Sequence, residues 1–161
     1  MFQLRGAASE EMKKMIFKEK NRLPQIVVSS ASKIYKGESY LQLPYVLLDY
    51  PRCFEKENIF AIRTMFWWGN FFSITLHLSG GYKNEFAGAL AKNIAVLRQD
   101  NYYICVNDDQ WQHHFEPDNY FVAAEKNKEE LKDIILHRPF IKIARKFPLA
   151  KWNEMPIILE Q

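Results

Sequence analysis

The chain has few cysteines and no long apolar run, and both absences narrow the class of protein. Its 161 residues contain only Cys53 and Cys105, too few for a disulfide framework and without the spacing of a metal-binding motif. No apolar run approaches the length of a membrane-spanning helix, and residues 1–6 lack the pattern of a signal peptide. We therefore expect a soluble, reduced, cytoplasmic protein without a membrane partner.

Common motifs of catalysis and nucleotide binding are absent as well. The chain contains neither Gly-x-x-x-x-Gly-Lys-Ser/Thr nor Gly-x-Gly-x-x-Gly, and it has no Gly-x-Ser-x-Gly nucleophile elbow. No internal repeat, low-complexity segment or linker divides it. We expect a single globular domain over residues 1–161, with no cofactor and no metal site.

The composition is that of a folded protein with a mild basic bias. Hydrophobic residues make up 48% of the chain and aromatic residues 15%, which is enough apolar surface to build a core and argues against disorder. The formal net charge is +3. Such a charge permits nucleic acid or anionic substrates as partners but does not point to them.

The most informative segment is residues 59–79, which the sequence predicts to be a β-hairpin turning at Gly69-Asn70. If those two residues form the loop, Trp68 pairs with Phe71, and alternation along the strands defines two faces. The expected core face carries Ala61, Met65, Trp67, Phe72, Ile74, Leu76 and Leu78, with Arg63 as its one charge. The other face, called here the aromatic-polar face, carries Ile62, Thr64, Phe66, Trp68, Phe71, Ser73, Thr75 and His77. A shift of one residue in the turn would change this assignment.

The remaining patterns predict helices around this hairpin. Helical spacing indicates helices near residues 9–23, 24–34, 82–97, 131–135 and 140–147, although the run at 26–28 could instead form a strand. Asn127 and Glu130 resemble a capping box. Short strands are expected at 45–48, 102–106 and 119–123. The fold class is therefore α+β, a mainly antiparallel sheet of about four or five strands flanked by helices.

A polar loop at residues 107–118 carries the clearest candidates for catalysis. It follows a predicted strand end and contains Asp109, His113 and His114, together with Trp111. Adjacent histidines in an extended chain point to opposite sides, which disfavours a shared metal. The competing structural explanation is a solvated turn in which Asp and Asn side chains bond the backbone.

The glycine turn that follows the hairpin is a candidate anion site. Ser79, Gly80 and Gly81 lead into a predicted helix, whose first amides attract anions, and Lys83 would add charge. The alternative is a tight turn that needs a positive φ. His77, two residues before the turn, is a candidate base or a histidine satisfied by a cross-strand hydroxyl.

Residues 134–153 contain no acidic side chain. If 140–147 is helical, Lys142, Arg145 and Lys146 form a basic stripe that could meet nucleic acid, while an ordinary solvated face is the competing explanation.

Three functional hypotheses follow. The first is a small binding domain that uses the aromatic-polar face, with an unknown small molecule or protein as partner; such a face also favours a homodimer. The second is a small enzyme that acts on an anionic, phosphorylated substrate with the imidazole and carboxylate groups of His77, Asp109, His113 and His114. The third is nucleic-acid binding through the basic stripe. The expected ligand-binding residues are Phe66, Trp68, Ser73, Thr75, Ser79, Gly80, Gly81 and Trp111.

Overall fold

The computed structural model describes the backbone of residues 2–159 and has an α+β fold. Seven strands form a mainly antiparallel sheet in the order β1-β2-β3-β4-β7-β5-β6. The strands are β1 Lys33–Tyr40, β2 Leu43–Glu55, β3 Asn58–Trp67, β4 Phe71–Ser79, β5 Tyr103–Cys105, β6 Tyr120–Val122 and β7 Phe140–Pro148. The α-helices are α1 Phe2–Lys18, α2 Gln25–Val28, α3 Gly80–Lys92, α4 Ile94–Gln99, α5 Lys128–His137 and α6 Met155–Leu159, with 3₁₀ turns η1 Ala123–Glu125 and η2 Leu149–Glu154. The fold class and the hairpin are confirmed, but the expected strand number of about four or five is too low.

The additional strands are β1, of which only residues 33–34 were expected to be helical, and β7. Residues 33–40 form β1, and residues 140–148 form β7, so the prediction of a helix at 140–147 is wrong. Residues 140–144 of β7 are all buried. A strand covered on both faces has a continuous apolar run, and periodicity cannot separate such a run from a buried helix.

The hairpin exists, but its loop is one residue longer than expected. β3 ends at Trp67 and β4 begins at Phe71. Between them, the Asn70 amide donates to the Trp67 carbonyl at 3.1 Å, and Gly69 has φ +75°. Both features are those of a type II turn with Gly69 at its third position. The rings of Trp67 and Phe71 lie 5.3 Å apart, so these two residues share a face. The expected pairing of Trp68 with Phe71 is wrong, and the residues of the two faces are redistributed.

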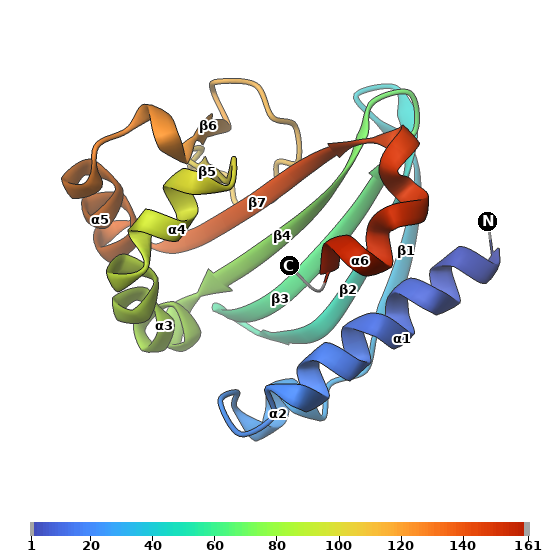
Figure 1. The fold of residues 1–161 in the computed structure, drawn as a ribbon, viewed down its shortest axis with the longest axis horizontal. Coiled ribbons are helices and arrows are strands. Elements are labelled where there is room, and N and C mark those ends of the chain that lie inside the picture. The colour runs from blue at the N-terminus through green and yellow to red at the C-terminus, as the bar shows by residue number, and fades with distance from the viewer. Residues whose placement is uncertain (1, 160–161) are drawn as a thin grey trace. The chain divides into compact units, whose positions relative to one another are not determined.

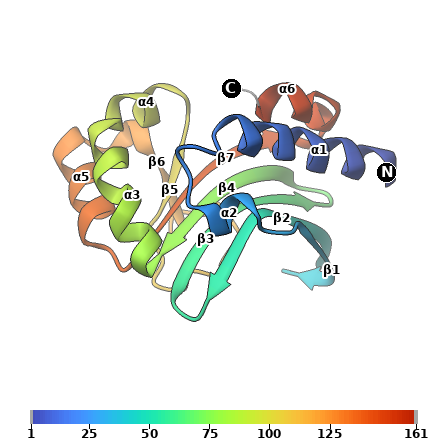
Figure 2. The ribbon, with the colours of Figure 1, turned by 90° about the horizontal axis from the view of Figure 1, so that it is seen from below.

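Contacts divide the chain into two compact units, each described by itself. Unit 1 comprises residues up to 53 together with 61–74 and the residues from 147 on. In this unit α1 and α6 pack on one face of the β2–β4 strands, as Figures 1 and 2 show from two directions. The core beneath the helices consists of Met12, Ile16, Leu48, Tyr50, Phe72, Met155 and Ile158. The apolar spacing of α1 at Met12, Met15 and Ile16 explains why this helix face is covered.

The opposite face of the same strands carries a second apolar cluster. Leu47, Met65 and Trp67 are buried there against tyrosines of β1 and β2. Alternation along the strand explains the two clusters, because neighbouring residues such as Leu47 and Leu48 point to opposite faces.

Unit 2 comprises residues 54–60 and 75–146. Its helices α3 and α5 pack together, and α4 also contacts α5 (Figure 1). Asn127 caps α5 by accepting the Glu129 and Glu130 amides, while the Glu130 side chain bonds the Asn127 amide, which confirms the capping box. The strands of this unit bury Cys105, Tyr120, Phe140 and Ala144 in one cluster. The expectation of a single domain stays a prediction.

No helix among the residues that the structure describes combines the length and the apolar character needed to cross a membrane.

Candidate functional site

The aromatic-polar face of the hairpin does not form. Phe66 and Phe72, which were expected on opposite faces, both contact Trp152, with ring centroids 4.7 and 5.3 Å away. Phe66 also meets the half-buried Trp68 at 4.8 Å. Phe66 therefore belongs to the packed core of unit 1, because the longer loop turns its side chain toward the face that carries Phe72.

The polar residues expected on that face are buried. Ser73, Thr75 and His77 are 3%, 7% and 2% exposed. In unit 2 the Nε2 atom of His77 lies 2.8 Å from Oε1 of Gln110, and its ring lies 5.5 Å from that of Trp111. His77 thus contacts the polar loop through side chains, and its expected role as a catalytic base stays a prediction.

The glycine turn is closed by protein groups. Ser79 donates its hydroxyl hydrogen bond to the Glu57 carbonyl, and the Gly81 amide donates to Oδ1 of Asn58 at 2.7 Å. Gly80 has φ +57°, and a Cβ added there would lie 2.9 Å from the Glu57 oxygen. The positive φ of Gly80 shows the expected tight turn, and the Gly81 amide already has an acceptor. Anion binding by Ser79, Gly80 and Gly81 stays a prediction.

Lys83 does not point at this turn. Its side chain is 8% exposed, and its ammonium donates to the Leu136 carbonyl at 2.5 Å. That carbonyl is in the last turn of α5, where the helix dipole favours a positive charge. Lys83 thus helps to join α3 to α5, and its charge is directed away from the glycine turn.

The polar loop is organised by its own side chains. The Asp109 amide donates to Asn107 Oδ1 at 2.8 Å, and the Asp109 carboxylate accepts the Trp111 amide at 2.9 Å. Accepting that amide lowers the pKa of Asp109, and the Gln112 side chain lowers it further. These are the backbone-bonding interactions of an Asx-type turn, and they supply a structural role for Asp109.

The other loop candidates take separate positions. His114 lies 3.2 Å from the Asp118 carboxylate, and His113 is half-buried. Trp111 is 46% exposed and stacks on Phe54 with ring centroids 6.2 Å apart. The catalytic roles of His113 and His114 and the ligand contact of Trp111 stay predictions.

The basic stripe does not form on one face. In a strand, alternate residues point to opposite sides, so Arg145 faces away from Lys142 and Lys146. Lys142 is 3% exposed and donates to the Gln112 carbonyl at 2.5 Å, and the Lys146 ammonium lies 5.2 Å from the Tyr103 ring centre. The stripe required a helix, and the strand removes its geometric basis.

Both cysteines are buried. Burial raises the pKa of the Cys105 thiol, so this group is a poor nucleophile at neutral pH. Among the described residues, no three His, Cys, Asp or Glu side chains gather where they could hold a metal ion.

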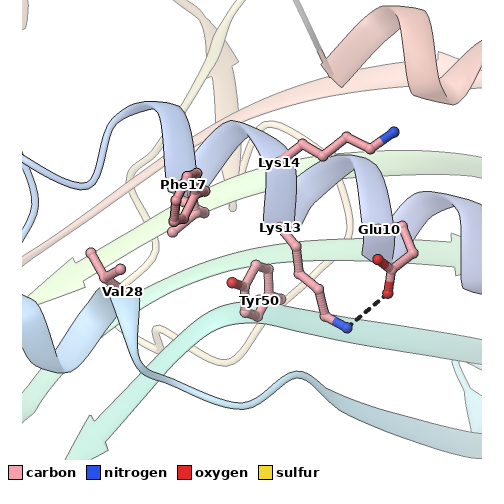
Figure 3. A pocket seen from close by; sticks show the side chains of 7 residues that line it. Glu10, Lys13, Lys14, Phe17, Val28 and Tyr50 are labelled. Atoms are coloured by element: carbon pink, nitrogen blue, oxygen red, sulfur yellow. Dashed lines mark hydrogen bonds and ion pairs between the residues drawn. The ribbon is translucent and has the colours of Figure 1, made fainter.

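A pocket of unit 1 was missed by the sequence reasoning. It has a volume of about 380 Å³ and opens between α1, α2 and β2 (Figure 3). This cavity is called the α1 pocket here. It is lined by Glu10, Lys13, Lys14, Ile16, Phe17, Val28 and Tyr50. The volume lies within the usual range for small-molecule sites. One sequence signal was available, because Phe17 lies in the lysine-rich helix beside the apolar positions that form its core stripe.

The α1 pocket combines an apolar wall with charged groups. Phe17 is 65% exposed, whereas Ile16 is buried in the core. Lys13 donates to Glu10 at 2.8 Å, and Figure 3 shows this pair on the opposite side of Tyr50 from Phe17 and Val28. Such a division into an apolar part and a polar part is typical of a site that orients an amphipathic molecule.

Tyr50 is the most unusual residue of the pocket. Its side chain is 6% exposed, yet its hydroxyl makes no hydrogen bond to another of the residues that the structure describes. Burial raises the pKa of this hydroxyl, with the Lys13 charge acting in the opposite direction. The hydroxyl therefore stays protonated at neutral pH and presents a donor at the pocket.

No family model, curated protein or solved structure matches this chain.

Proposed function

We propose that the protein is a small binding domain, and that the α1 pocket is its ligand site. The observation that carries this proposal is the Tyr50 hydroxyl, a polar group on a largely buried side chain that has no protein partner among the described residues. The Tyr50 oxygen is not among the buried side-chain atoms that lack a partner in the described part of the chain, so water reaches it from the pocket. A ligand that accepts this hydrogen bond would replace water at the pocket.

Exposed Phe17 supplies the second support. The Phe17 side chain is 65% exposed, so a ligand that covers it removes apolar surface from contact with water. Aromatic residues are enriched at binding hot spots for this reason. The Lys20 ammonium lies 4.2 Å from the Phe17 ring centre, so the ring already has a charged neighbour on α1's lysine-rich side. Phe17 and the Tyr50 ring together offer a ligand two aromatic surfaces.

The test is a fragment screen by ligand-observed NMR, followed by mapping of amide shifts on the labelled protein. We expect hits to perturb the amides of Lys13, Phe17, Val28 and Tyr50. Phe17→Ala removes an exposed side chain and should weaken these hits without unfolding the chain. Val96→Ala, which truncates a 47% exposed side chain on α4, is the matched control. Absence of hits, or hits unaffected by Phe17→Ala, would refute the proposal.

A homodimer also stays a prediction. Its motivation was an exposed aromatic face on the hairpin, and Phe66 and Phe72 of that segment instead pack against Trp152.

A further inference from the structure

The chemistry of the α1 pocket narrows the class of ligand that it can take, and this step rests on the function proposed above. The pocket's apolar surface comes from Ile16, Phe17, Val28 and the ring of Tyr50. Aromatic rings pack well against a flat ring or a short aliphatic chain. A volume of about 380 Å³ lies near the lower end of the range for ligand pockets, so the occupant is a small molecule with an apolar body.

The charges of the pocket's lysines are already balanced. Lys13 donates to Glu10 at 2.8 Å, and Lys14 donates to Glu11 at 2.6 Å. The two lysine side chains are 47% and 66% exposed, so their ammonium groups stay in contact with water. Figure 3 shows the Lys14 side chain extending away from Tyr50. These two ion pairs leave no excess lysine charge for a ligand.

The Tyr50 hydroxyl lies on the apolar side of the pocket. In Figure 3 its oxygen is on the side of Val28, whereas the Lys13 ammonium and Glu10 lie on the other side of the ring. The hydroxyl has no hydrogen-bond partner among the residues that the structure describes. Burial raises its pKa, so it keeps its proton at neutral pH. A ligand that covers Val28 therefore meets a phenol donor, and the paired lysines lie elsewhere.

A charged ligand fits this arrangement poorly. An ion placed against Phe17 and Val28 would lose water without gaining a counter-ion from the lining, because Lys13 and Glu10 neutralise each other. A neutral carbonyl oxygen loses less when it leaves water, and it can accept one hydrogen bond from the phenol. The pocket therefore matches an uncharged molecule with an acceptor at one end.

We infer that the α1 pocket binds a small uncharged apolar molecule with one hydrogen-bond acceptor, such as an aryl ketone. Its body lies against Phe17 and Val28, and its oxygen accepts from the Tyr50 hydroxyl.

The experiment titrates the labelled protein with four planar probes of one shape and follows the amide shifts by NMR. Acetophenone is neutral and carries a carbonyl acceptor, isopropenylbenzene has CH₂ in place of that oxygen, benzoate is an anion, and benzamidinium is a cation. Both ions should bind at least about 5-fold more weakly than acetophenone, because they lose more on leaving water.

Benzoate also tests the influence of Lys20. The Lys20 ammonium lies 4.2 Å from the Phe17 ring centre, although Lys20 is not part of the lining. If either ion binds as tightly as acetophenone or more tightly, the uncharged ligand is overturned while the binding site remains.

Tyr50→Phe tests the hydrogen bond. It removes the hydroxyl but keeps the ring, and it breaks no hydrogen bond to another described residue, so the fold should be retained. It should weaken acetophenone about 5-fold, as expected for one neutral hydrogen bond, and leave isopropenylbenzene unchanged. Comparing both probes in both proteins cancels the difference in their hydrophobicity. Equal changes for the two probes would overturn the role of the hydroxyl.

The matched control is Tyr35→Phe, which makes the same chemical change in the same unit. Tyr35 packs with Leu47, Met65 and Trp67 in the cluster on the opposite face of the strands. This substitution should leave the acetophenone affinity unchanged. A loss equal to that of Tyr50→Phe would overturn the assignment of the acceptor to Tyr50.

The two proposals fail in different ways. If the fragment screen gives hits that depend on Phe17 while all four probes fail to bind, the inferred ligand class is overturned and the binding site is retained. If the screen is empty as well, both proposals are overturned.

Discussion

The ion pair between Asp49 and Arg63 predicts a large loss of stability when its acidic partner is neutralised. Asp49 is fully buried on β2, and its two oxygens accept from Nε and Nη2 of Arg63, both at 2.7 Å. Asp49→Asn keeps the size of the side chain but replaces one acceptor oxygen with an NH₂ donor. That donor faces an Arg63 N–H, and the guanidinium loses the negative charge of its bidentate partner.

The expected magnitude follows from burial. Breaking a buried ion pair by removing one partner costs about 3–5 kcal/mol, because the remaining charge stays desolvated. Arg63 is 12% exposed, so a little water can reach it, and we expect the low end, about 3 kcal/mol. A loss of this size lowers the folding equilibrium constant by roughly 100-fold and the Tm by about 6–12 °C for a chain of this length.

Urea denaturation followed by tryptophan fluorescence measures the free energy of unfolding, and the m-value should stay unchanged. Asp133→Asn is the matched control: Asp133 pairs with His137 at 2.8 Å, but its side chain is 74% exposed. An exposed pair contributes only about 0–1 kcal/mol. If Asp49→Asn destabilises the chain no more than Asp133→Asn, burial does not govern this ion pair and the reasoning is refuted.

Three further predictions concern single positions. Gly80→Ala should destabilise the protein by about 1–3 kcal/mol, because alanine is strained at φ +57° and its Cβ would meet a backbone oxygen. Gly88→Ala in α3 has open space around its Cβ and should stabilise the protein by about 1 kcal/mol. Equal effects of the two substitutions in urea denaturation would contradict this difference. Asn127→Ala removes the α5 cap and should cost about 1 kcal/mol in the same measurement, and no loss would show that the cap is dispensable. The amide of Trp111 lowers the folded-state pKa of Asp109. The Asp109 carboxylate therefore stabilises the fold above its unfolded-state pKa, and this contribution is lost as pH falls through the folded-state pKa. NMR titration should give a pKa for Asp109 below the usual range, and a normal or raised pKa would contradict the hydrogen bond.

Local features were readable from the sequence. The α5 cap needs only Asn127 and Glu130, three residues apart, so its side-chain bonds form within one turn. The hairpin was likewise found from a turn signal between two apolar runs. The register of the hairpin could not be read from the sequence. The chain turns through Trp67 to Asn70 instead of through a two-residue loop, so Phe66 and Phe72 lie on the same face and not on opposite faces.

The assignment of β7 shows where pattern alone fails. Phe140, Ile143, Ala144 and Phe147 satisfy helical spacing, yet the segment is a strand. Five consecutive buried residues at its start remove the alternation that would have marked it. Because Lys142 is among those five, its position could not be inferred from its charge.

The sequence by itself determined the α+β class, the hairpin and the local caps and turns, because these depend on residues a few positions apart. The strand number, the faces of the hairpin and the α1 pocket were decided only by tertiary structure. Lys13 and Phe17 of α1 line the same pocket as Tyr50 of β2, although more than thirty positions separate them from it along the chain. No spacing rule links such residues, since their contact depends on how a whole helix packs on a strand and which of its side chains lie at the edge of that contact.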